Sequence, residues 1–288
     1  MFRSAKYLAA IGASLFATSA LALSGPYHST FQASALELSH LAGQIEITVG
    51  GPGVSVSVTG QPEELAAVTV TNTGTVVRIE SSQHRHDIFG DVRKLATYKI
   101  SVPKGARLDL DKIIGGLDVG DVGGDLYLRG VAVEGHVGRM HSADVSLAGS
   151  GRLTIGDVEQ DAKMSIAGSG NITASDANFV DVSIAGSGGI KFHVARTGLS
   201  VRISGSGDVA GEKSEGPLYV GIAGSGTVDV KDGHANPFKV KISGHGNVIF
   251  GGEGTDPDIS ISGSGGVKLG SMKGHLSKHG QGDIIIGK

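Results

Sequence analysis

The histidines near the middle of the chain are the side chains best suited to metal chemistry. His84 and His86 flank Arg85 and precede Asp87. In an extended segment, residues two apart point to the same side, so both imidazoles could face one cation. A zinc site needs further ligands at defined spacing, and the cationic Arg85 would repel a metal ion. The pattern therefore favours a solvated loop, and we expect neither a metal nor a cofactor here.

Three further histidines lie in the glycine-rich part of the chain. His245 stands where related segments carry serine, and His275 and His279 lie close to the end of the sequence. If successive segments stack, these imidazoles could approach one another. Isolated surface histidines are the simpler expectation.

Glycine-flanked serines are the next candidates, because such loops can hold a phosphate or present a nucleophile. Gly186–Gly189 and Gly205–Asp208 resemble fragments of dinucleotide-binding loops, but no helix follows to face a phosphate. Gly149-Ser-Gly151 and its copies lack the strand-to-helix turn of a nucleophile elbow. Clustered carboxylates of the kind that polysaccharide-cleaving enzymes use are also missing. We expect no enzyme, and a polysaccharide-acting enzyme remains the alternative.

Calcium-binding β-rolls also repeat glycine and aspartate, but on a nine-residue period. Here Asp208 follows its glycine pair directly, and most other copies carry a different residue at that place: Asn171, Gly189, Thr227 and Gly266. Without a row of carboxylates there is little to hold Ca²⁺. We therefore expect no calcium site.

The glycine-flanked serines belong to one repeated unit. Its copies are Val145-Ser-Leu-Ala-Gly-Ser-Gly151, Met164–Gly170, Val182–Gly188, Val201–Gly207, Val220–Gly226, Val240–Gly246, Ile259–Gly265 and the degenerate Leu276–Gly282. The first glycine of each pair stands at 149, 168, 186, 205, 224, 244, 263 and 280, so consecutive copies are 17 to 20 residues apart. Self-similarity at such a period indicates a stacked repeat architecture.

Alternation within the unit identifies its elements. Aliphatic residues alternate with small or polar ones, as in Val182-Ser-Ile-Ala185, and the alternation resumes after the glycines, as in Thr227-Val-Asp-Val230. This period of two indicates strands, and nothing between the copies has helical spacing. We predict an all-β fold, a right-handed parallel β-solenoid with about 19 residues per coil and glycines at its corners.

Stacking of the coils would align the residue between the two corner glycines. One such residue per coil would face outward, which gives the row Ser150, Ser169, Ser187, Ser206, Ser225, His245 and Ser264. This row, called the serine ladder below, is the candidate ligand surface. Small residues at a tight corner are also what steric fit alone would select, and that alternative stays open.

The first 22 residues resemble a secretory signal peptide. Arg3 and Lys6 precede an apolar stretch from Leu8 to Leu21, and Ala20-Leu-Ala22 offers a cleavage site. Cleavage after Ala22 would lower Lys+Arg from 25 to 23 against 28 acids, so the net charge falls from -3 to -5. An acidic chain without basic clusters argues against nucleic acid as a partner. We expect export to the periplasm, cell surface or medium, with no transmembrane segment after cleavage.

Composition agrees with a packed repeat. The 48 glycines of 288 residues are about twice ordinary usage, while a hydrophobic fraction of 39% is too high for a disordered linker. Since cysteine is absent, neither disulfides nor thiolate metal sites can stabilise the chain. Stability must come from packing and backbone pairing.

The runs Ser165-Ile-Ala-Gly-Ser-Gly-Asn-Ile172 and Arg202-Ile-Ser-Gly-Ser-Gly-Asp-Val209 resemble the GIN-domain family of exported bacterial proteins, described as autotransporter adhesin heads. The earlier part of the chain looks like that family's opening strands, through the segments Ile45–Val49, Val54–Gly60, Glu63–Leu65, Val76–Ile79 and Tyr98–Pro103. The resemblance covers residues 33–288 and implies a parallel β-solenoid in the cell envelope. It supplies no catalytic or binding residues.

Three segments follow from these observations: a signal peptide (1–22), a strand-rich cap (23–104) and glycine-rich solenoid repeats (105–288). A cap is expected because the open end of a solenoid exposes unpaired strand edges. Ile284–Ile286 at the other end is either a final paired strand or a contact surface. The predicted function is an exported binding module without catalytic activity, an adhesin head whose partner is a cell-surface glycan or an envelope protein. A purely structural envelope spacer is the alternative.

Overall fold

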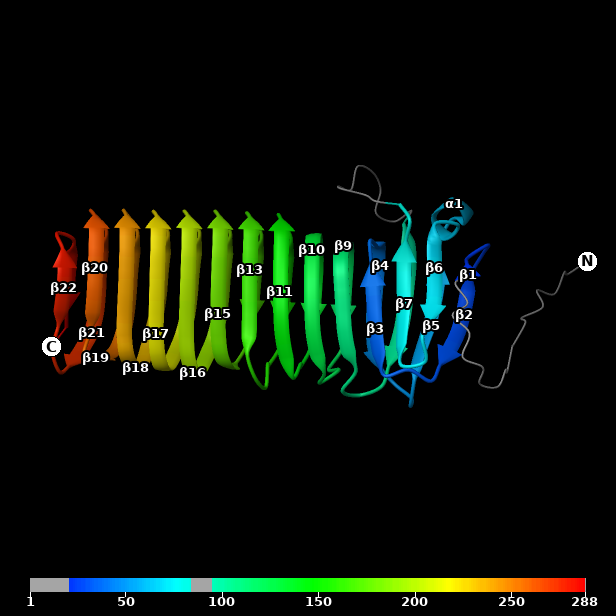
Figure 1. Cartoon of the computed structure of the whole chain (residues 1–288), viewed down its shortest axis with the longest axis horizontal. Coiled ribbons are helices and arrows are strands. Elements are labelled where there is room, and N and C mark those ends of the chain that lie inside the picture. The colour runs from blue at the N-terminus through cyan, green and yellow to red at the C-terminus, as the bar shows by residue number, and fades with distance from the viewer. Residues whose placement is uncertain (1–20, 84–94, 288) are drawn as a thin grey trace, which may run out of the picture.

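The structure is a computed structural model that describes residues 21–83 and 95–287. The chain forms a β-solenoid of about 9 turns with about 19 residues per turn, as the repeat predicted. Its coils lie side by side along one long axis, from β9 to the C-terminal end (Figure 1). The solenoid strands are β9 (Arg107–Val119), β10 (Asp125–Val137), β11 (Ser142–Gly149), β12 (Arg152–Ile155), β13 (Ala162–Gly168), β14 (Asn171–Ala174), β15 (Ala177–Gly186), β16 (Gly189–Gly205), β17 (Asp208–Gly224), β18 (Thr227–Gly244), β19 (Asn247–Thr255), β20 (Asp258–Gly263), β21 (Gly266–Lys273), β22 (Ser277–Gly280) and β23 (Asp283–Ile286).

Parallel pairing stacks equivalent residues of successive coils. Ile166 of β13 pairs with Ile184 of β15, which pairs with Ile203 of β16. Their side chains point inward and are at most 2% exposed, whereas the alternate residues face outward. The interior is therefore a continuous column of aliphatic side chains, and each coil buries its apolar face against its neighbours.

Corner glycines make room for this column. A Cβ on Gly207 would lie 2.5 Å from the Cγ2 atom of Ile184, one coil earlier, and a Cβ on Gly246 would lie 2.5 Å from Cγ2 of Ile222. Carbon atoms that are not bonded to each other do not approach that closely. From Gly188 onward, the second glycine of each corner thus lets the isoleucine of the preceding coil reach the corner, which ties the Gly-Ser-Gly motif to the aliphatic repeat.

The chain before the repeats combines parallel and antiparallel pairing. Its elements are β1 (Leu21–Ala22), β2 (Tyr27–Phe31), β3 (Ala35–Ser39), β4 (Ala42–Val49), β5 (Val54–Thr59), α1 (Pro62–Leu65), β6 (Val68–Asn72), β7 (Val76–Ser81) and β8 (Ala96–Val102). β3 and β4 both pair in parallel with β9 and so continue the stack. β6 pairs antiparallel with β7, and β5 pairs antiparallel with both β8 and β2. This section lies over the N-terminal end of the solenoid (Figure 1).

The expectation of a strand at Glu63–Leu65 was wrong, because these residues lie in the single helical turn α1. Pro62 at the start of the turn has the backbone angle that a helix needs there. Glu63 and Glu64 place negative charge in the first turn, which suits the helix dipole. Leu65 is fully buried and anchors the turn against the core.

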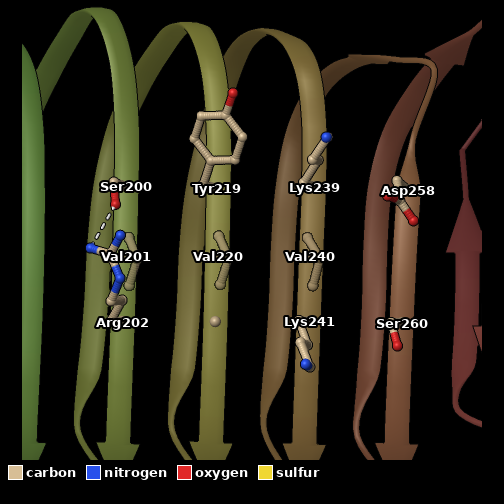
Figure 2. A pocket seen from close by; sticks show the side chains of 11 residues that line it. Ser200, Val201, Arg202, Tyr219, Val220, Lys239, Val240, Lys241, Asp258 and Ser260 are labelled. Carbon is tan, nitrogen blue, oxygen red and sulfur yellow. Dashed lines mark hydrogen bonds between the residues drawn. The ribbon is translucent and has the colours of Figure 1, made fainter.

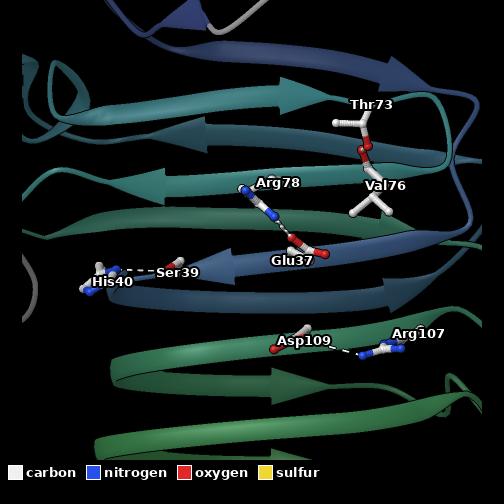
Figure 3. Close-up of polar contacts among 8 residues, drawn as sticks. All are labelled: Glu37, Ser39, His40, Thr73, Val76, Arg78, Arg107 and Asp109. Carbon is white, nitrogen blue, oxygen red and sulfur yellow. Dashed lines mark hydrogen bonds and ion pairs between the residues drawn. The ribbon is translucent and has the colours of Figure 1, made fainter. Parts of the chain in front are cut away.

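An ion pair links the neighbouring strands β7 and β3. Glu37 accepts a 2.8 Å hydrogen bond from Nε of Arg78, which lies opposite it in register (Figure 3). This hydrogen bond raises the pKa of the Arg78 guanidinium. On β9, Arg107 lies 3.9 Å from Asp109 and places its guanidinium 4.6 Å from the centre of the Tyr127 ring on β10. Such exposed pairs contribute about 0 to 1 kcal/mol each, so the core carries most of the stability.

Two expectations concern the ends of the chain: a paired strand or contact surface at Ile284–Ile286, and a signal peptide at residues 1–22. Ile284–Ile286 lies in β23, which pairs in parallel with β21, so this run is a final paired strand. The predicted signal peptide lies mostly outside the described residues. Ala22 pairs with Thr69, and Leu23 is buried and donates a 3.1 Å hydrogen bond to the carbonyl of Val68. Cleavage after Ala22 would keep the Leu23 contact.

Among residues 21–83 and 95–287, no helix has the length and apolar character needed to cross a membrane.

Candidate functional site

The serine ladder occupies the first corner of successive coils. Gly149, Gly168, Gly186, Gly205, Gly224, Gly244 and Gly263 are paired in register from coil to coil. The residue after each of them is exposed: Ser150, Ser169, Ser187, Ser206, Ser225, His245 and Ser264. Parallel strands are spaced by about 4.8 Å, so the ladder is a straight row with one side chain at each such step.

Backbone hydrogen bonds fix the corners. The amide of Ser206 donates to the carbonyl of Gly186 at 2.9 Å, and the amide of Ser225 donates to the carbonyl of Gly205 at the same distance. Gly224 has φ of 135°, a backbone conformation that a side chain disfavours, and a Cβ there would collide with the carbonyl oxygen of Gly205. The backbone requires glycine, whereas the exposed serine between the glycines is free to meet a ligand.

Two further rows run beside the ladder on the strands that lead into these corners. The row nearest the corner consists of Ala148, Ala167, Ala185, Ser204, Ala223, Ser243 and Ser262. The next row consists of Ser146, Ser165, Ser183, Arg202, Gly221, Lys241 and Ser260. Together with the serine ladder we call these rows the ladder face. Because most of its side chains are small, the ladder face is nearly flat.

A depression interrupts this flat surface at Gly221 of β17. The cavity has a volume of about 330 Å³, and Arg202, Tyr219, Lys239 and Lys241 are among the residues that line it. A second cavity of about 340 Å³ lies against it toward the corner and shares Arg202, Gly221 and Lys241. Figure 2 shows Arg202, Tyr219 and Lys241 on three neighbouring strands. This depression was not predicted from the sequence.

A third cavity lies near the N-terminal section and has an acidic lining. It has a volume of about 500 Å³, and Glu46, Asp118, Glu134 and His136 are among its lining residues. Glu46 is engaged with Lys99 at 3.4 Å. In the described ranges 21–83 and 95–287, no group of three or more His, Asp or Glu side chains is arranged to hold a metal ion.

Of the histidines considered in the sequence analysis, the structure describes His245, His275 and His279. His84 and His86, with Asp87, fall outside the described residues. His245 and His275 are exposed, and Nε2 of the exposed His279 lies 3.1 Å from the hydroxyl of Ser277.

Other titratable side chains form surface pairs, either between neighbouring coils or within one strand. Asp176 contacts Nδ1 of His193 at 2.6 Å and the guanidinium of Arg196 at 2.8 Å. Nearby on β17, a hydrogen bond from Lys213 lowers the pKa of the Glu215 carboxyl and raises the pKa of Lys213 itself. Each pair bridges charges at the surface, where solvent screens the interaction.

Comparison with known proteins gives one family match. Residues 196–286 match the model of the family described as "Putative auto-transporter adhesin, head GIN domain", which confirms the resemblance seen in the sequence. A search of the curated proteins finds no match.

Several solved structures are similar along most of their length. A "putative adhesin" from Bacteroides fragilis is 15% identical, with 92% of this chain and 98% of that chain covered and a TM-score of 0.31. A "putative adhesin" from Parabacteroides distasonis is 17% identical, with 91% and 96% covered and a TM-score of 0.41. A "putative lipid binding protein" from the same species is 17% identical, with 92% and 95% covered and a TM-score of 0.35.

Proposed function

Starting from the match of residues 196–286 to an adhesin head family, we propose that this protein is an exported binding module of the cell envelope or cell surface. The ladder face is its binding surface, and it acts without catalysis. Its partner is a cell-surface glycan or an envelope protein. The signal-like segment at residues 1–22 supports export.

One observation carries the proposal: three rows of mostly small side chains make a nearly flat surface along seven successive coils, from the corner at Gly149 to the corner at Gly263. The backbone beneath this surface is fixed by strand pairing on both sides, so binding would cost little ordering entropy. A flat surface with hydroxyls at regular spacing suits a partner that is itself extended, such as a polysaccharide chain.

The test uses the mature chain, residues 23–288, after circular dichroism has verified its β-structure. A glycan array and a preparation of cell envelopes are screened for saturable, competable binding. The variant Ser169→Gln/Ser187→Gln places bulk on the ladder face. The matched control Thr154→Gln/Thr173→Gln places equal bulk on exposed positions of β12 and β14, which follow the corner. We expect the ladder variant to weaken binding and the control to bind as the unaltered chain does.

A structural spacer is the second candidate function, and the steric requirement at the corners favours it. The glycine at the Gly224 corner is explained by its φ and by the collision that a Cβ would cause, without any ligand. A spacer needs length and stability but tolerates exterior substitutions. If the folded chain bound neither glycans nor envelopes, the spacer would replace the binding module.

A further inference from the structure

We propose that the depression at Gly221 is a specific site for an acidic saccharide. In this site a sugar ring packs against Tyr219, and its carboxylate or sulfate lies between Arg202 and Lys241. The inference rests on the proposed function, because it places a ligand of defined chemistry on the ladder face. It concerns a few residues of β16, β17 and β18, not the whole surface.

Strand register brings the three side-chain positions together. Arg202, Gly221 and Lys241 are direct neighbours on successive strands, so the two cationic residues are attached about 10 Å apart, two strand spacings. Two residues earlier on these strands, Tyr219 pairs with Lys239. Tyr219 is 42% exposed, although large aromatic side chains are usually more buried. Figure 2 shows Tyr219 and Lys239 in one row, and Arg202 and Lys241 in the next.

The glycine that opens the depression has no visible structural role. A Cβ on Gly221 would meet no atom closer than 4.0 Å, and its backbone lies outside the left-handed region. Gly224, three residues later, has a positive φ and no room for a Cβ. The equivalent positions two coils away on either side carry Ser183 and Ser260. The backbone would accept a side chain at Gly221, so a need for the open space itself explains the glycine.

Two of the three cations around the depression form no ion pair with a described residue, although Asp258, which pairs in register with Lys239, also lines the cavity. At the position equivalent to Lys239 in an earlier coil, Lys163 is paired with Asp144 at 3.4 Å. In contrast, neither Lys239 nor Lys241 forms an ion pair within the described part of the chain. Arg202 contacts Asp181 and the hydroxyl of Ser200, both at 3.2 Å. The contact with Asp181 draws one guanidinium nitrogen toward the preceding coil, on the side away from Gly221, and the other N–H groups remain available to a ligand.

This combination selects an acidic saccharide. An exposed aromatic ring offers an apolar surface to the C–H side of a sugar ring, and its hydroxyl remains in water. Guanidinium and ammonium groups form the strongest hydrogen bonds with carboxylate and sulfate oxygens. The hydroxyls of Ser204 and Ser243 line the adjoining cavity and can meet sugar hydroxyls. Nucleic acid fits less well, because three local cations on a net acidic chain neutralise few phosphates.

The experiment measures binding of the chain 23–288 to oligogalacturonate, chondroitin sulfate and neutral dextran. Arg202→Ser and Lys241→Ser each remove a cation and install the residue that neighbouring coils carry, so folding is retained. Gly221→Gln fills the depression but keeps all three cations. Arg202→Ser and Lys241→Ser should each weaken binding to at least one of the two acidic saccharides about tenfold or more, as expected when a charge-assisted hydrogen bond is lost. Gly221→Gln should weaken the same binding because its side chain occupies the space of the sugar ring. Raising the salt concentration should weaken binding by the unaltered chain.

Lys268→Ser is the matched control, because it removes one exposed lysine from β21, away from the ladder face. It should bind the acidic saccharides as the unaltered chain does. Equal loss in Lys268→Ser would indicate unspecific charge attraction and overturn the site. Full binding by Gly221→Gln would overturn it as well.

Further outcomes separate this site from the proposed function. If the unaltered chain binds envelopes or a neutral glycan but neither acidic saccharide, the site is refuted and the binding module stands. If it binds nothing, both are refuted. Tighter binding to vesicles of anionic phospholipid or to DNA than to either saccharide, lost in the same variants, would assign the depression to a different ligand.

Discussion

The substitution pair Ile184→Asp and Ser183→Asp tests the register on which every surface assignment depends. The Ile184 side chain is 1% exposed and lies in the aliphatic column, whereas its neighbour Ser183 is exposed. Losing the buried isoleucine costs about 1.5 to 3 kcal/mol. A carboxyl group without a hydrogen-bond partner in that environment adds at least about 2 kcal/mol. We expect Ile184→Asp to lower the free energy of unfolding by roughly 4 kcal/mol or more.

Ser183→Asp should change the stability by no more than about 0.5 kcal/mol, because its side chain faces water and lies beside Arg202 in the next coil. Urea unfolding followed by circular dichroism measures both variants. Hydrogen exchange then locates the damage, which should be greatest in the coils next to Ile184, since each coil contacts only its neighbours.

The same pair has a pH signature. Burial raises the pKa of the introduced carboxyl above its unfolded value of about 3.9. The folded state therefore binds the proton more tightly, and the destabilisation by Ile184→Asp should grow as the pH rises from about 4 to 7. Equal losses for the two variants at pH 7, or a larger loss for Ser183→Asp, would refute the assigned register.

Three other expectations follow from local geometry. Gly224→Ala should lower the free energy of unfolding by more than about 2 kcal/mol, because Gly224 has a positive φ and a Cβ there would collide with the neighbouring coil. Gly221→Ala should change the free energy of unfolding by less than about 0.5 kcal/mol, and thermal unfolding of both variants tests the difference. Ser214→Ala should raise the free energy of unfolding by about 1 kcal/mol in urea titrations, since the Ser214 hydroxyl is buried and has no hydrogen-bond partner among the described protein atoms. The pair with Lys213 lowers the pKa of Glu215, so this pair stabilises the fold above the unfolded pKa near 4.3, and the stabilisation is lost as the pH falls through the folded value. The small stability advantage of the unaltered chain over Glu215→Gln, measured by urea unfolding, should therefore disappear under acid.

The solenoid could be predicted from the sequence because one local pattern repeats in every coil. The alternation in Val182–Ala185 determines which side chains face inward, and the glycine pair marks the corner. Stacking follows, since a single coil cannot bury its own apolar face. The exposure of the serine ladder could be predicted for the same reason.

The section before the repeats could not be predicted in the same detail. Its strands do not repeat, so nothing local indicates that β3 and β4 pair with β9 while β5 and β6 run antiparallel to their partners. The turn at Pro62–Leu65 is too short for helical periodicity, and its proline and two glutamates were the available signal.

The depression at Gly221 was missed because it depends on a difference between coils. Aligning the repeats emphasises what they share, whereas Arg202, Gly221 and Lys241 are the members of their row that depart from serine. Comparing the outward-facing residue at this one position in all aligned copies would have shown that Gly221 lies between Arg202 and Lys241. The position of Tyr219 beside them follows from the same register.

The most direct test of the account is the binding of the folded chain 23–288 to glycans and cell envelopes, measured in parallel for Ser169→Gln/Ser187→Gln and Thr154→Gln/Thr173→Gln. If the ladder face is the binding surface, the unaltered chain binds saturably, the ladder variant binds more weakly and the control variant binds as the unaltered chain does. Absence of binding by the folded chain, or equal binding by both variants and the unaltered chain, would contradict the claim that the ladder face is a binding surface.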